Sequence, residues 1–77
     1  PNTPELKDQA HEKIRNSMYA LGVLYREKLE NYPKSIAVLE ELLQKYPASS
    51  IEQDVLYQLY LASMQHGDQI RATNRYF

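Results

Sequence analysis

The residues of this chain that could perform chemistry are few and scattered. Its two histidines, His11 and His66, lie on different predicted helices. A bound zinc ion needs three or four ligands that converge on one point, and neither histidine has a clear partner three or four residues away. We therefore expect both histidines to be solvated on the surface, and we predict no metal site.

The carboxylates and the serines do not suggest a catalytic centre either. The glutamates that could serve as acid–base pairs all fall on helix faces that the hydrophobic pattern predicts to be exposed to solvent. They are Glu12, Glu27, Glu30, Glu40 and Glu41. No serine lies in the sharp strand-to-helix turn of a hydrolase nucleophile, and two glycines are too few for a phosphate-binding loop. We predict that the chain is not an enzyme and that it binds no cofactor.

The composition excludes several other classes of function. Nine basic and ten acidic residues are interspersed, so no basic surface is available to attract nucleic acid. Several tyrosines could stack on bases but lack basic neighbours, so packing in a core or groove explains them better. They are Tyr19, Tyr25, Tyr57 and Tyr60. No apolar run is long enough to cross a bilayer, and we expect no direct membrane insertion by this segment.

The first element that the sequence predicts is a long helix from Pro4 to about Leu29. Thr3 can cap this helix, with Pro4 at its first position. Apolar residues recur along it at helical spacing, namely Leu6, Ala10, Ile14, Met18, Leu21 and Tyr25. The alternative is a break near Asn16-Ser17, where either residue could cap a new helix. Residues 4–14 would then be the second helix of a preceding repeat.

Three further helices are expected. One runs from Pro33 to about Tyr46 and a third from Ile51 to Gln65; Gly67-Asp68 then forms a turn, and Ile70 to Phe77 begins a fourth. The apolar series assigned to the second and third helices is Ile36, Leu39, Leu42, Leu43, Tyr46, Val55, Leu56, Leu59 and Tyr60. This pattern predicts an all-α chain of paired helices that bury their apolar stripes against each other.

The stretch from Met18 to Pro47 resembles a tetratricopeptide repeat (TPR). The TPR pattern asks for a large residue, Leu-Gly, an aromatic, a small residue, another large residue and a final proline. With one extra residue allowed in the turn, the matching positions are Met18, Leu21, Gly22, Tyr25, Ser35, Leu39, Leu42 and Pro47. A less perfect second match places Leu59 where the first has Leu21, Tyr60 where it has Gly22, and Ala72 and Tyr76 in the second helix.

This resemblance implies antiparallel helix pairs in a short right-handed solenoid of about four helices. A single TPR-like domain would span residues 1–77, with repeat one at about 16–48 and a truncated repeat two at about 51–77. The chain would be a fragment of a longer array, consistent with its start at Pro1 rather than Met. Arrays need about three units to bury a continuous core. We therefore expect an open apolar face and self-association, unless the long first helix covers that face.

The amino-acid sequences of the two repeats also resemble those of TPR lipoproteins of Bacteroidota, including the family associated with gliding motility and type IX secretion. More distantly, it resembles the TPR lipoproteins of outer-membrane assembly and cell-division coordination. These resemblances imply a parent protein in the periplasm or at the outer membrane, and a cytoplasmic location stays open.

In the TPR family, the first helices of successive repeats line a concave groove that holds a peptide or a partner helix. Carried over to this chain, the resemblance assigns to that groove Asn16, Tyr19, Ala20, Val23, Arg26, Glu27, Asp54, Tyr57, Gln58, Leu61, Met64 and Gln65. Such a groove has an apolar centre and polar edges, as a peptide-binding surface requires. The expected function is a non-catalytic scaffold for protein–protein interaction. The alternatives are a structural spacer within a longer superhelix and an accessory domain of a helical enzyme.

Overall fold

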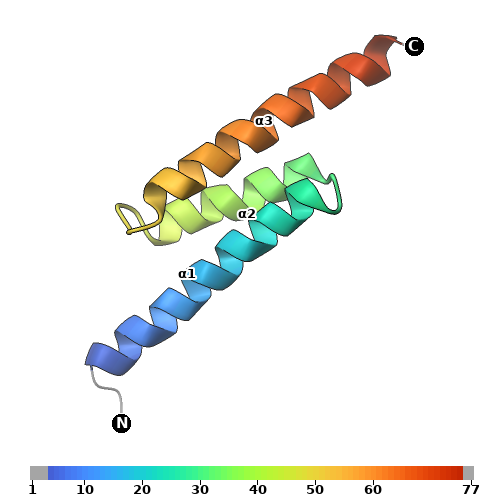
Figure 1. The fold of residues 1–77 in the computed structure, drawn as a ribbon. Helices are drawn as coiled ribbons and strands as arrows, with labels where there is room; N and C mark the ends of the chain where they lie inside the picture. Colours follow the sequence, from blue (N-terminus) through green and yellow to red (C-terminus); the bar gives the residue numbers. More distant parts are fainter. Residues whose placement is uncertain (1–3, 76–77) are drawn as a thin grey trace.

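Three helices form the part of the chain described by the computed structural model, residues 4–75. They are α1 (Pro4–Glu27), α2 (Tyr32–Lys45) and α3 (Glu52–Arg75), and no strand occurs within these residues. The middle helix lies between the two longer ones and runs antiparallel to both (Figure 1). The all-α class and the antiparallel pairing are confirmed, but the structure has three helices where four were expected.

The first helix is uninterrupted over its 24 residues. It continues through Asn16 and Ser17, so the alternative of a break at that point is wrong. It ends at Glu27, slightly before the expected end. The backbone then reverses at Glu30, which has a φ of 50°, and the Asn31 N–H donates to the Tyr25 carbonyl at 2.9 Å.

The second helix begins and ends within one residue of its predicted bounds. Asn31 caps its start, because the side-chain oxygen accepts from the Lys34 N–H at 3.3 Å. Pro33 lies in the first turn, where its missing N–H removes no hydrogen bond. At the other end the Tyr46 N–H donates to the Leu42 carbonyl. The chain then turns through Ala48, whose N–H donates to the Glu52 carboxylate at 2.7 Å.

The third helix corrects the prediction of a turn at Gly67-Asp68. It continues through both residues to Arg75, and Gly67 does not take the positive φ of a glycine that ends a helix. Asp68 pairs with Arg71 along the helix surface instead of capping a new helix. One glycine in a helix costs only about 1 kcal/mol relative to alanine, so the surrounding helix formers prevail.

This continuity also changes the second repeat match. Ala72, which that match placed in a separate helix, is exposed on α3. Tyr76 lies outside the described residues. Tyr60, matched to Gly22, points to solvent rather than into a helix interface.

The core is small and centred on α2. Leu39 is fully buried, and Leu42 and Val55 are almost so. Partly buried side chains pack around these three, namely Met18, Tyr19, Leu43, Tyr46, Ile51 and Leu59. Ala62 of α3 is also fully buried. The predicted apolar face of α2 is confirmed, because its leucines contact both neighbouring helices.

The predicted apolar stripe of α1 is only partly buried. Met18 packs against the core and Tyr25 is half-buried, but Leu21 is 41% exposed. Leu6, Ala10 and Ile14 are exposed as well. On α3, Leu56 and Tyr60 are exposed, whereas the hydrophobic pattern predicted that they are buried. The apolar residues of each outer helix span more than one face, and α2 covers only one of them.

Helix length explains much of this exposure. α2 has 14 residues, whereas α1 and α3 have 24 each. At 1.5 Å per residue these lengths are about 21 Å and about 36 Å. The first turns of α1 and the last turns of α3 therefore extend beyond α2 at opposite ends of the molecule (Figure 1), which measures 58 × 20 × 15 Å.

Candidate partner-binding surface

A close contact between α1 and α2 depends on a glycine and a serine, as the small positions of the repeat pattern predicted. Gly22 is buried against Leu39, and the fully buried Ser35 hydroxyl donates to the Gly22 carbonyl at 2.7 Å. This contact sets the separation of α1 and α2. It therefore helps to position the α1 side chains that were expected to line the groove.

Three of the expected groove residues meet across α1 and α3. The Arg26 Nε donates to Gln58 Oε1 at 3.0 Å, and Arg26 Nη1 donates to Gln65 Oε1 at 3.3 Å. Arg26 Nη2 pairs with Glu27 of the same helix at 3.1 Å. The Arg26 side chain is only 11% exposed. Arginine suits this position because its planar group can donate in several fixed directions at once.

Tyr19 has a different role from the one expected of it. It was assigned to the apolar centre of the groove, but it packs against the core cluster and is half-buried. Val23 and Leu61 are also half-buried. The α1 part of the expected apolar centre therefore supports the fold as well as facing outwards.

The α3 part of the expected groove is more accessible. Tyr57 is 60% exposed and Met64 is 43% exposed. Together with Leu61 they have i, i+4 and i+7 spacing, which places them along one side of the helix. The polar residues Asn16, Glu27 and Asp54 are exposed. The accessible apolar surface thus lies on α3, beside the hydrogen bonds of Arg26.

Only one of the two histidines that were predicted to be solvated is exposed. His11 is exposed, but its Nδ1 lies 2.9 Å from the Tyr46 hydroxyl and the two rings meet edge to face. His66 is partly buried, and its Nδ1 is buried without a hydrogen-bond partner in the described part of the chain. Within residues 4–75, no three side chains of histidine, cysteine, aspartate or glutamate are grouped so that they could hold a metal ion.

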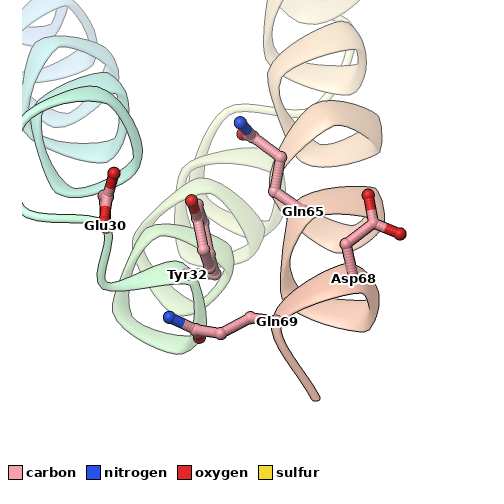
Figure 2. Close-up of a pocket in the computed structure, with 5 residues that line it drawn as sticks. All are labelled: Glu30, Tyr32, Gln65, Asp68 and Gln69. Carbon is pink, nitrogen blue, oxygen red and sulfur yellow. The ribbon is translucent and has the colours of Figure 1, made fainter. Parts of the chain in front are cut away.

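A cleft that was not predicted lies where the α1–α2 turn faces the second half of α3. It has a volume of about 390 Å³ and is lined by Glu30, Tyr32, Gln65, Asp68 and Gln69 (Figure 2). The site was not predicted because a turn at Gly67-Asp68 would have placed Gln65 and Gln69 on different elements. In a continuous helix, Gln65, Asp68 and Gln69 have i, i+3 and i+4 spacing and share one face.

No family model, curated protein or solved structure matches this chain. In residues 4–75, none of the helices combines the length and apolar character needed to cross a membrane. Among the features of the described surface, two could bind a partner. They are the apolar side chains of α3 beside Arg26, and the polar cleft at the α1–α2 turn.

Proposed function

We propose that this chain is a non-catalytic, TPR-like interaction module that binds a peptide or a partner helix on the surface shared by α1 and α3. The observation that carries this proposal is the exposure of Tyr57 and Met64 beside the hydrogen-bonded Arg26, Gln58 and Gln65. Aromatic and methionine side chains next to satisfied polar groups are typical of the centre of protein interfaces.

The geometry favours a partner that lies along α3. Residues with i, i+4 and i+7 spacing form a strip parallel to the helix axis, and Tyr57, Leu61 and Met64 have this spacing. The Arg26 hydrogen bonds hold α1 against the same region of α3. A partner helix would thus meet a fixed surface, and little ordering would be needed on binding.

A pair of substitutions on neighbouring residues tests this surface. Peptides that bind the chain would first be selected from a random library, and their dissociation constants would then be measured by fluorescence anisotropy. Tyr57→Ala should weaken binding about fivefold or more, as expected for the loss of an aromatic anchor. Leu56→Ala is the control, because Leu56 is also exposed but points about 100° away around the helix.

The opposite result would exclude the proposed surface. If the selected peptides bind Tyr57→Ala as they bind the unmodified chain, and Leu56→Ala weakens them, the partner lies on the side of α3 turned away from Arg26. Circular dichroism of both variants would show that each keeps its helix content. Loss of binding therefore could not be attributed to unfolding.

A second candidate function is that of a structural spacer in a longer superhelix. The observation that favours it is the apolar exposure on the outer sides of both long helices, at Ile14, Leu21 and Leu24 of α1 and at Leu56 and Tyr60 of α3. An internal repeat would bury such side chains against its neighbours. Isolated chains should instead associate, and sedimentation over a range of concentrations would measure this. A stable monomer at every concentration would contradict it.

The envelope setting belongs to the same proposal and rests on the similarity of the repeats to Bacteroidota TPR lipoproteins. Fractionation of cells that carry a tagged version of the parent protein would test it. Recovery with the outer membrane or periplasm is expected, and recovery with the cytoplasm would contradict it.

A further inference from the structure

An apolar face of α1 is turned away from the rest of the fold. α2 and α3 lie on one side of α1 (Figure 1), where Gly22 contacts α2 and Arg26 bonds to α3. Around the helix, Leu21 points about 100° and Leu24 about 160° away from Gly22. We define the outer face of α1 by five exposed residues that share this direction, namely Ala10, Ile14, Ser17, Leu21 and Leu24.

The outer face is bordered by lysines. Lys7 and Lys13 lie on its two sides, each about 60° from its centre around the helix axis. Lys28 follows the last turn of α1, and its N–H donates to the Leu24 carbonyl at 2.9 Å. Lys28 therefore continues the line of the outer face by one residue, and three positive charges surround the apolar side chains.

α2 contributes a fourth lysine to this border. Lys34 is exposed, and its Nζ lies 5.7 Å from the centre of the Tyr25 ring, which is on the same side of α1 as Lys7. Four of the five lysines of the chain thus gather around one face. None of the four is in an ion pair within residues 4–75, where both salt bridges involve arginine.

The acidic residues of α1 lie on the opposite side of the helix. All are exposed and at least about 100° from the centre of the outer face; they are Glu5, Asp8, Glu12 and Glu27. Charges that alternate along the sequence are therefore separated around the helix axis. An apolar face with a basic border is typical of helices that lie on anionic bilayers, where lysine stems cover apolar surface and the ammonium groups reach outwards.

The composition of the outer face argues against a protein partner. Protein interfaces are enriched in aromatic residues, methionine and arginine and depleted in lysine. Tyr57 and Met64 of α3, beside Arg26, match that description, whereas the outer face of α1 has aliphatic side chains and lysines. A second copy of the chain would bring two lysine borders together, and like charges repel. A nucleic acid would match the lysines but not Leu21 and Leu24.

We propose that the outer face of α1 binds the surface of an anionic lipid bilayer. α1 would lie in the plane of the surface, with Leu21 and Leu24 in the headgroup region and the lysines at the lipid phosphates. The helix would not cross the bilayer. The surface shared by α1 and α3 stays accessible in this orientation, so membrane binding does not depend on the proposed peptide binding.

Co-sedimentation of the full chain with lipid vesicles tests the proposal. Vesicles of phosphatidylcholine with about one third phosphatidylglycerol should bind the chain at least tenfold more tightly than vesicles of phosphatidylcholine alone. Added salt should weaken this binding, because it screens the attraction between the lysines and the lipid phosphates. Failure to sediment with the anionic vesicles, or equal binding to both kinds, would show that the proposal is wrong.

A pair of charge variants locates the contact. Lys13→Gln should weaken binding to the anionic vesicles about fivefold, as expected for one lysine near an anionic surface. Arg75→Gln is the control, because it removes the same charge from an exposed position in the last turn of α3 and should change binding less than twofold. Equal effects of the two variants would indicate non-specific attraction and contradict a site on α1.

A pair of apolar variants tests the centre of the face. Leu24→Gln should weaken vesicle binding about fivefold or more, because less apolar area leaves water. Leu56→Gln is matched to it, since Leu24 is 45% exposed and Leu56 on α3 is 44% exposed; it should have little effect. Circular dichroism would show that both variants remain helical. A Leu24→Gln variant that binds as well as Leu56→Gln would contradict the proposal.

The remaining outcomes assign the face to a different occupant. If the chain ignores vesicles but self-associates, and Leu24→Gln abolishes the association, the outer face binds a second copy. If it ignores vesicles but binds an acidic amphipathic peptide through Lys13 and Leu24, the occupant is a protein. Either result overturns membrane binding. Tyr57→Ala should leave vesicle binding unchanged, so failure of the α3 surface and failure of the outer face can be told apart.

Discussion

Gly22 of α1 and Leu39 of α2 approach so closely that no side chain fits between them. A Cβ atom built on Gly22 would lie 2.6 Å from Leu39 Cδ2 and 2.7 Å from its Cγ. Leu39 is fully buried and surrounded by the core, so it has little room to move. The contact makes Gly22 a packing requirement rather than a flexible point in the helix.

Comparing the two glycines tests this contact directly. Gly22→Ala should lower the free energy of unfolding by about 1 kcal/mol, because overpacking outweighs the gain in helix propensity. A Cβ on Gly67 would meet only the Arg71 side chain at 3.5 Å or more, so Gly67→Ala should raise stability by roughly 0.5–1 kcal/mol. Urea denaturation measures both. Equal stabilisation by the two substitutions would contradict the close approach.

The hydroxyl of Ser35 stabilises the same contact. Ser35→Ala removes the buried hydrogen bond to the Gly22 carbonyl, and stability should fall by roughly 0.5–1 kcal/mol after the better helix propensity of alanine is included. Ser63 is exposed on α3, so Ser63→Ala should be neutral or slightly stabilising. A Ser35→Ala variant that is as stable as Ser63→Ala would show that the hydrogen bond contributes nothing.

The bridge between α1 and α3 can be measured by a double-mutant cycle. Arg26→Ala and Gln58→Ala, singly and together, should reveal a coupling energy of about 0.5–1.5 kcal/mol, because the bond is partly buried. The Asp68–Arg71 pair is the control: both side chains are well exposed, and its coupling should be at most about 0.5 kcal/mol. Additive effects of Arg26→Ala and Gln58→Ala would argue against the bridge.

The continuity of α3 gives a further prediction. Cα chemical shifts should remain helical from Glu52 through Gly67 and Asp68, and amide exchange should become faster only in the last turns, which extend past α2. A stretch of non-helical shifts at Gly67 would restore the turn that the sequence suggested. Gly67→Ala should leave this shift pattern unchanged.

The sequence was sufficient where local chemistry determined the structure. Asn31 and Pro33 carry a cap and a first-turn proline, so the start of α2 was predicted within one residue. The small residues Gly22 and Ser35 marked a close contact between α1 and α2 for a similar reason. Only residues without bulk can occupy such a place.

The sequence was insufficient where the outcome depended on tertiary context. Glycine is compatible with both a helix and a turn, so the pair Gly67-Asp68 was ambiguous. For the same reason the sequence did not predict that Gln65, Asp68 and Gln69 share one face of α3. The apolar residues of α1 cover more than one side of the helix. Periodicity could not show that Gly22, rather than Leu21, would face α2. The reach of Arg26 to α3 depends on helix placement, which no local pattern encodes.

Because α2 forms an interface with both α1 and α3, neither helix hairpin should fold independently. Leu39 and Leu42 share one cluster with Val55 of α3, and Met18 and Tyr19 of α1 pack against it. Removal of either outer helix would expose Leu39 and Leu42 to solvent. Heating should therefore melt the chain in one step, and a hairpin cut from it should be largely unstructured.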